Sequence, residues 1–173
     1  MARELATRLG CGYIDVADLA RREGLTLGYD EEAQAHLIDE EGVRERLRAV
    51  ARGALYVVDT HVVSAVPPEL VEVAIVLRLD PRELEFRLSS RGYPRRKVLE
   101  NVQAEILDAC LVEAVSLLGE GRVFEVDATG KSPEEVVAEV LRVIRERSGA
   151  RPGSVDWLER LGDEALKYLS ASA

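Results

Sequence analysis

Hydrophobic residues along the chain form two patterns, short continuous runs and longer segments with helical spacing. Four runs have the length and β-branched content of strands: 13–16, 54–58, 73–77 and 123–126. Helical spacing of apolar residues occurs in the segments 1–9, 40–52, 81–90, 94–118 and 133–147. The nearly continuous apolarity of the runs favours strands that are covered on both faces. The alternation of the two patterns predicts an α/β fold, a parallel sheet flanked by helices on both faces.

The end of the chain, from residue 149 onward, differs from the rest. The sequence ARPGS is typical of a linker. Apolar residues then recur on one helical face: Val155, Leu158, Leu161, Ala165, Leu166 and Leu169. We therefore expect one domain over residues 1–148, followed over 149–173 by a linker and an amphipathic helix that docks on the domain. A tail that binds a partner protein is the alternative interpretation.

Composition narrows the class of protein. The 173 residues carry 23 Lys and Arg against 32 Asp and Glu, a net charge of −9, which disfavours general binding to duplex nucleic acid. No apolar run approaches the roughly 18 residues of a membrane span, and no secretory signal opens the chain, so we expect a soluble cytoplasmic protein. Cys11 and Cys110 match no C-x-x-C spacing, and we interpret both as buried small hydrophobic residues.

Polar residues directly after the apolar runs are the first candidates for a functional site, because ligands of open parallel sheets bind beyond the carboxyl ends of the strands. These residues are Asp15, Asp18, Asp59, Thr60, His61, Arg78 and Asp80. An Asp at a strand tip is where phosphoryl-transfer proteins hold Mg²⁺, usually through water, so Asp59 is the candidate metal residue. His61 is a candidate for orienting a water molecule or transferring a proton. The plainer alternatives are that Asp59 caps the next segment and that His61 is an ordinary polar residue.

A cationic stretch contrasts with the acidic total. Residues 91–101 read RGYPRRKVLEN, and five cations with no acid lie between positions 87 and 97. Arg87, Arg91 and Arg95 recur four residues apart, and guanidinium groups match phosphate oxygens bidentately. Gly92 and Pro94 interrupt the helix, which suits a hinged cover over a polyphosphate. Solvated surface charge is the alternative.

Four motifs occur in order and support the first of these interpretations: YIDVADLARREGLTLGYDEE, VVDTH, VLRLD and RGYPRRKVLENVQAEI. With them the chain resembles, from about residue 2 to residue 144, the nuclear and archaeal adenylate kinases of the isoenzyme-six type, a family also known as ribosome-assembly ATPases. The resemblance implies a P-loop NTPase-type three-layer sandwich with an AMP-binding segment over about 15–38 and a lid over about 90–100. It also implies ATP and AMP as substrates and Mg²⁺ as the cofactor.

The resemblance assigns roles on the ATP side by matching motifs. Asp59 and His61 match an Asp-x-His version of the Mg²⁺ motif, and His61 is expected to support water activation if ATP is hydrolysed. Arg91, in RGY, matches the lid arginine that contacts ATP, and Arg87 and Arg95 accompany it. The expected catalytic residues are therefore Asp59, His61 and Arg91.

On the acceptor side, the resemblance points to two pairs of residues. Asp18 and Arg21, in DLAR, match the start of the AMP-binding segment. Asn101 and Gln103 fall in ENVQ, which the family places near the acceptor nucleotide. All four are therefore expected to contact AMP.

The chain departs from the family in the phosphate loop. Nowhere does it contain G-x-x-x-x-G-K-[ST], and VDATGKS at 126–132 lacks the first Gly at the required spacing. In the family, a strand and this loop precede the helix that here reads MARELATRLG. Without them we expect severely impaired catalysis and unpaired edges on the neighbouring strands. We hypothesise that Met1 is a late start, with roughly 18 residues upstream; a native mass of 19.1 kDa would contradict this.

The leading functional hypothesis is a phosphotransferase that converts ATP and AMP into two ADP, with ATP hydrolysis accompanying it. One alternative is an assembly factor that holds a small-subunit ribosomal protein through the acidic segments 30–32 and 39–41 and uses ATP hydrolysis as a switch. The other is an inactive, truncated protein that only binds nucleotide. ADP formation that requires AMP favours the kinase, whereas AMP-independent phosphate release favours the switch.

Overall fold

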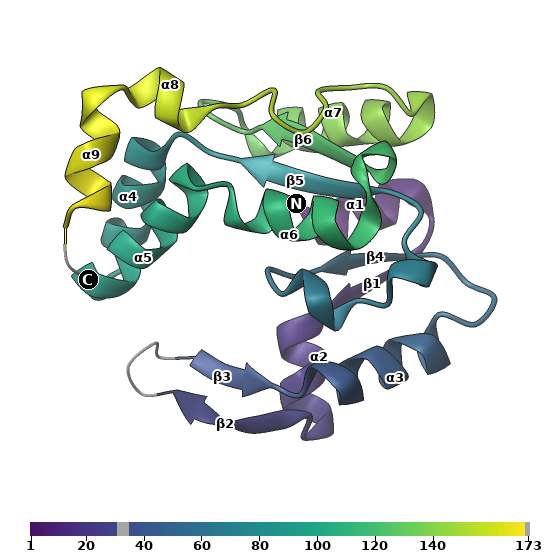
Figure 1. Cartoon of the computed structure of the whole chain (residues 1–173). Helices are drawn as coiled ribbons and strands as arrows, with labels where there is room; N and C mark the ends of the chain where they lie inside the picture. The colour runs from purple at the N-terminus through teal and green to yellow at the C-terminus, as the bar shows by residue number, and fades with distance from the viewer. Residues whose placement is uncertain (31–34, 172–173) are drawn as a thin grey trace. The chain divides into compact units, whose positions relative to one another are not determined.

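The computed structural model describes residues 1–30 and 35–171 and has an α/β fold with parallel strands and flanking helices (Figure 1). The chain divides into two compact units. Unit 1 comprises Met1–Glu72 and Pro133–Leu141, and unit 2 comprises Val73–Ser132 and Arg142–Ala173. Within the described ranges, no helix is long and apolar enough to cross a membrane.

Unit 1 contains a parallel strand pair and an antiparallel hairpin. Its elements are α1 (Ala2–Leu9), β1 (Gly12–Asp15), α2 (Val16–Glu23), β2 (Thr26–Asp30), β3 (Ala35–Ile38), α3 (Glu40–Val50) and β4 (Tyr56–Asp59), followed by the 3-10 turns η1 (Val63–Ala65) and η2 (Pro68–Leu70). Strands β1 and β4 are parallel, with Asp15 directly opposite Asp59, and β2 pairs with β3. The core of this unit joins α2, α3 and η1 and consists of Val16, Leu19, Ala20, Val43, Leu47 and Ala65.

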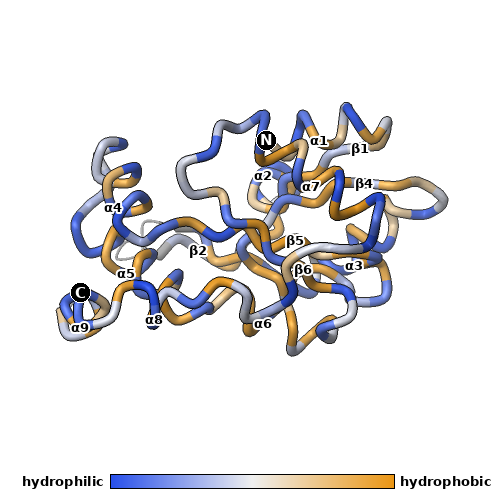
Figure 2. The backbone as a smooth tube through the Cα atoms, turned by 90° about the horizontal axis from the view of Figure 1, so that it is seen from above, coloured by the Kyte–Doolittle hydropathy of each residue, from blue (hydrophilic) through white to orange (hydrophobic). Residues whose placement is uncertain are grey.

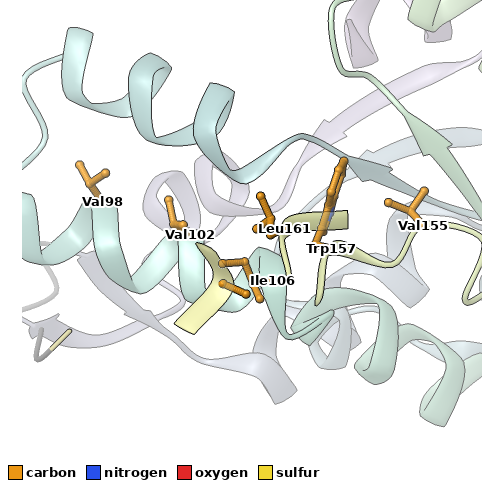
Figure 3. Close-up of a cluster of buried hydrophobic side chains, with 7 residues drawn as sticks. Val98, Val102, Ile106, Val155, Trp157 and Leu161 are labelled. Carbon is orange, nitrogen blue, oxygen red and sulfur yellow. The ribbon is translucent and has the colours of Figure 1, made fainter. Parts of the chain in front are cut away.

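Unit 2 contains the second parallel pair. Its elements are β5 (Ala74–Arg78), α4 (Pro81–Ser90), α5 (Arg95–Ile106), α6 (Ala109–Leu118), η3 (Glu120–Arg122), β6 (Val123–Asp127), α8 (Trp157–Leu161) and α9 (Asp163–Leu169). Strands β5 and β6 are parallel, with Arg78 opposite Asp127. The apolar cluster of this unit joins α5 to the C-terminal segment and consists of Val98, Val102, Ile106, Val155, Trp157, Leu161 and Ala165 (Figure 3). Helix α7 (Pro133–Glu146) is divided between the two units.

Capping residues in the sequence set several helix boundaries. The Asp15 carboxylate accepts a hydrogen bond from the Asp18 backbone N–H and starts α2 immediately after β1. Asp39 and Asp80 cap α3 and α4 in the same manner. Gly10 has φ 66° and ends α1 in the left-handed conformation that glycine adopts without strain. The chain therefore passes from β1 into α2 with no intervening loop, which fixes Asp15 at the strand tip.

The single helix predicted over 94–118 is wrong, because the structure has two helices there. The break lies at Asp108, whose φ of 57° is left-handed. Aspartate tolerates this conformation better than most residues, and here the Arg78 guanidinium holds the Asp108 carboxylate. The break also resets the helical phase, so Cys110 is exposed rather than buried as predicted. Cys11 is partly buried.

The C-terminal segment forms two short helices rather than one. Gly162, with φ 51°, separates α8 from α9. The predicted apolar face is correspondingly interrupted: Leu158 is 48% exposed and Leu166 is 62% exposed, whereas Leu161 and Ala165 are buried. The segment still packs on α5, through the cluster of Figure 3.

Three of the predicted strands, β1, β4 and β5, are less covered than expected, and all four residues of β1 are only partly buried. Strand β6 is buried along four of its five positions, whereas the first three residues of β4 are only partly buried and Leu77 in β5 is 40% exposed. The apolar character of β4 and β5 is visible in Figure 2. In the part of the chain that the structure describes, β4 pairs only with β1 and β5 only with β6. One edge of β4 and one edge of β5 therefore carry no strand partner there.

Candidate functional site

The carboxyl ends of β1 and β4 border a cavity of about 280 Å³. It is lined by Asp15, Ala17, Ile38, Asp59, Thr60 and His61. Asp59 is the last residue of β4, and its side chain is exposed. The parallel register places Asp15 directly across from it. Strand direction and register thus bring two carboxylates and an imidazole to one edge of the strand pair, as expected for a parallel sheet.

A tyrosine holds one of these carboxylates. The Tyr13 hydroxyl donates a hydrogen bond of 3.2 Å to Asp59 Oδ2. Burial, together with the negative charges of Asp59 and Asp15, raises the pKa of the Tyr13 phenol above its ordinary value, so the hydroxyl keeps its proton at neutral pH. The Arg3 guanidinium lies 4.6 Å from the centre of the Tyr13 ring. Sequence reasoning missed Tyr13, because it lies within the apolar run rather than after it.

The segment after β4 is fixed by a small turn. The Thr60 hydroxyl accepts a hydrogen bond from the Val62 N–H at 2.9 Å and lies 3.1 Å from the Val62 carbonyl oxygen, to which it donates. This turn presents His61 at the cavity, next to Asp59. The structure therefore brings together the two residues of the predicted Asp-x-His motif. Oxygen donors of Asp15 and Asp59 are of the kind that Mg²⁺ prefers, so the residues present fit this ion.

The predicted AMP-binding residues of α2 lie close to this edge in sequence but not in the cavity lining. The Asp18 carboxylate pairs with Arg22 at 2.9 Å and with Arg21 at 3.3 Å. Both arginine side chains are more than half exposed. Arg21 is thus accessible to a phosphate group that competes with Asp18. Of the expected segment 15–38, residues 31–34 lie outside the described part of the chain, as do two acids of the run 30–32.

The predicted lid residues lie in unit 2, around the turn between α4 and α5. Arg87 forms an i,i+4 ion pair with Glu83. Arg91 ends α4 through its backbone N–H, and its side chain is exposed. Arg95 begins α5 and, with Tyr93, lines a second cavity of about 380 Å³. The contact of these arginines with ATP remains a prediction.

The two remaining candidates make local contacts. Asn101 is exposed, and its side-chain amide donates to the Lys97 carbonyl at 2.7 Å. The Gln103 amide donates to the carbonyls of Tyr168 and Ala171, at 2.8 and 3.2 Å. Gln103 therefore anchors the end of α9 in this structure, and its predicted contact with AMP would compete with those two bonds.

Arg78, which sequence analysis places among the polar residues after the strands, is buried in an ion network. Its guanidinium contacts the carboxylates of Glu105, Asp108 and Glu125. Trp157 Nε1 also donates to Glu105, at 2.7 Å. The neighbouring candidate, Asp80, pairs with Arg82, and this hydrogen bond is the main reason that the pKa of Asp80 is lowered. Arg78 is thus part of the packing of unit 2 rather than of an open site.

Comparison with known proteins finds a matching family model and several similar proteins. A family model described as "AAA domain" matches residues 1–108. A protein of Thermococcus onnurineus named "Putative adenylate kinase" is 39% identical over 169 residues, which cover 98% of this chain and 89% of the relative. Proteins of the same name from Thermococcus kodakarensis and Methanocaldococcus jannaschii are 40% and 34% identical, over 98% and 94% of this chain and 90% and 88% of the relatives.

Proposed function

Because the chain belongs to the AAA-domain family and to the family of these archaeal adenylate kinase relatives, we propose that it transfers the γ-phosphoryl group of ATP to AMP. The observation that carries the proposal is the presence of Asp59 and His61 in the lining of one cavity at the tip of β4. Magnesium, when bound with ATP, supplies positive charge that offsets the charge of the transferring group. The isoenzyme-six type of adenylate kinase is the subfamily that the four sequence motifs favour.

The residues of the chain have distinct roles in this reaction. Asp59 would hold the hydrated Mg²⁺ through its carboxylate, with Asp15 opposite it. His61 is placed to orient water in the accompanying ATPase reaction. Arg91 and Arg95 are exposed and are assigned to the phosphates of ATP. Arg87 takes part only if its ion pair with Glu83 opens.

The acceptor is assigned to the segment that begins at α2. Arg21 offers an exposed guanidinium for the phosphate of AMP, and Asp18 holds that guanidinium when AMP is absent. Asn101 and Gln103 are the further AMP-binding candidates, and Gln103 reaches AMP only if it releases the end of α9.

The absence of a phosphate-loop motif from the 173 residues is expected to limit the activity of this chain. The 173 residues contain no G-x-x-x-x-G-K-[ST] sequence, so the backbone N–H cradle and the Lys that this loop provides are not supplied by that motif. We therefore expect severely impaired turnover by this chain and much faster turnover when an upstream strand and loop are added.

A coupled assay of ADP formation tests the proposed function. ATP, AMP and Mg²⁺ are supplied to the chain as printed and to a version extended upstream by a strand and phosphate loop. We expect AMP-dependent formation of two ADP per cycle in the extended protein. Phosphate release at the same rate with and without AMP would instead support the nucleotide switch, and no turnover in either protein would support an inactive nucleotide-binding protein.

The assembly-factor alternative has less support in the described residues. Of the acidic segment 39–41, Asp39 caps α3, and Glu40 and Glu41 both pair with Arg44. These carboxylates are already engaged within unit 1, which weakens the case for a surface that holds a basic ribosomal protein. That alternative therefore rests on the family resemblance and on AMP-independent ATP hydrolysis, if it is observed.

A further inference from the structure

The position of Tyr13 follows from the strand register. Tyr13 lies opposite Val57 in the parallel pair, and Asp59 follows Val57 by two residues, so Tyr13 and Asp59 lie on the same face. Diagonal neighbours of this kind are about 7–8 Å apart at their Cα atoms, a distance that a tyrosine side chain spans. The hydroxyl accordingly reaches Asp59 Oδ2 at 3.2 Å. A shorter residue at position 13 would leave this oxygen without the contact.

The same face carries a second carboxylate. Asp15 is directly opposite Asp59, an arrangement of like charges that is destabilising by itself. Each carboxylate has its own donor: Asp15 Oδ1 accepts from the Asp18 N–H at 2.9 Å, and Asp59 Oδ2 accepts from Tyr13. The two donors hold the acids in separate, defined contacts. The Arg3 guanidinium, 4.6 Å from the ring centre, restrains the tyrosine from the side of α1.

Tyr13 is not among the residues that line the cavity, so it acts through Asp59 rather than on a ligand. We infer that Tyr13 is a positioning residue, whose hydroxyl fixes the Asp59 carboxylate by binding Oδ2 and leaves Oδ1 for the water shell of a divalent cation. The inference rests on the proposed function, because it takes Asp59 as the residue that carries the metal. Loss of partners that orient a metal-binding group typically weakens metal affinity by about 10–100-fold.

Two measurements on the 173-residue protein test this role without relying on turnover. The first uses ¹³Cζ-labelled tyrosine and follows five resonances by NMR. Asp59→Asn is expected to shift the Tyr13 resonance and to leave the other four in place. The Tyr13 signal is assigned from its loss in Tyr13→Phe.

The second measurement uses Mn²⁺ alone as the probe. The chain has two histidines, so the ring protons of His61 can be assigned with a His36→Gln variant. We expect Mn²⁺ to broaden the His61 signals. We expect Tyr13→Phe to raise the Mn²⁺ concentration that removes half of the His61 signal by about tenfold, the lower end of the range for the loss of orienting partners. Tyr56→Phe, on the neighbouring strand, is the matched control and should leave that concentration unchanged.

Each outcome decides the inference. An unshifted Tyr13 resonance in Asp59→Asn would overturn the inference. It would also be overturned if the same Mn²⁺ concentration removed half of the His61 signal in Tyr13→Phe and in Tyr56→Phe, or if Mn²⁺ did not broaden the His61 signals at all. If both NMR effects are found while the protein extended upstream by a strand and phosphate loop shows no phosphoryl transfer, the proposed function fails and the positioning role stands. Circular dichroism of Tyr13→Phe checks that the variant is folded.

Discussion

At the scale of single residues, Arg78 shows how an apparent site residue can be structural. Its side chain is 1% exposed and contacts three carboxylates, from α5, from the break after it and from β6. Burial by itself lowers the pKa of Arg78, but the charges and hydrogen bonds of Glu105, Glu125 and Asp108 outweigh that effect and raise it. The guanidinium is therefore charged at all relevant pH values. Sequence position indicated a polar residue at a strand end, but only the fold reveals its buried partners.

Replacing Arg78 tests this interpretation. Arg78→Ala leaves Glu125, which is itself buried, without its cation, and we expect a loss of about 3–5 kcal/mol in the free energy of unfolding. Urea denaturation followed by circular dichroism measures the change. Arg8→Ala, which breaks an exposed i,i+4 pair with Glu4, is the control and should cost less than about 1 kcal/mol. Equal stability of the two variants would show that the network does not stabilise unit 2.

At the scale of elements, the sequence predicted where most helices and strands lie, and it failed where tertiary contacts decide. Helix α4 has the predicted bounds, because Asp80 and Pro81 mark its start in the sequence. The break at Asp108 depends on Arg78, thirty residues earlier, and periodicity contains no sign of it. The β2–β3 hairpin was missed because its strands are short and its partners become evident only when they pair.

Helix α9 is attached to both helices that flank the Arg91 turn. The Tyr168 hydroxyl donates to Glu85 of α4 at 2.8 Å, and Gln103 of α5 donates to the Tyr168 carbonyl. Burial first, and then Glu85, raise the pKa of Tyr168 to about 12. The folded state thus favours the neutral phenol. The resulting stabilisation is complete below the ordinary tyrosine pKa near 10 and is lost as pH rises from there to about 12.

A Tyr168→Phe variant should reveal this dependence. At pH 8 we expect the variant to be less stable by about 0.5–1.5 kcal/mol, the usual net value of a hydrogen bond. The difference should shrink between pH 10 and pH 12, because the ionised phenol of the natural chain is repelled by Glu85. Urea denaturation at pH 8, 10 and 12 gives the comparison, with Tyr56→Phe as the control. A stability difference between the two proteins that stays constant from pH 8 to pH 12 would contradict the assignment of this stabilisation to the neutral phenol of Tyr168.

At the scale of the whole molecule, the sequence predicted the α/β class and the parallel direction of the strands. It also led us to expect strands covered on both faces, whereas the structure has two separate two-stranded parallel sheets in its described residues. Hydropathy reports that a run is apolar, and it cannot report which neighbour covers the run. The apolar content of β4 and β5 suits central strands, whereas in the described residues each has one strand partner and one edge without a partner, and each is partly exposed.

Hydrogen exchange measures the consequence of these edges. Strand β6 is buried and is paired with β5, and its Glu125 also forms a bridge with Ala150. Strand β4 has β1 as its strand neighbour in the described residues and is partly exposed. We expect amides of β6 to be protected at least about tenfold more than those of β4, since local opening requires less free energy where fewer contacts are lost. Similar protection of the two strands would show that another segment or a second copy of the chain covers β4.

The transfer of label from [γ-³²P]ATP tests the role of Asp59 most directly. The protein extended upstream by a strand and phosphate loop is given labelled ATP and Mg²⁺, with and without AMP. The products are then separated by chromatography. We predict that the label appears in ADP only when AMP is present, that Asp59→Asn slows this transfer about 10–100-fold, and that Asp163→Asn, an exposed change in α9, leaves it unchanged. Label released as free phosphate regardless of AMP, or transfer by Asp59→Asn as fast as by Asp163→Asn, would contradict the account.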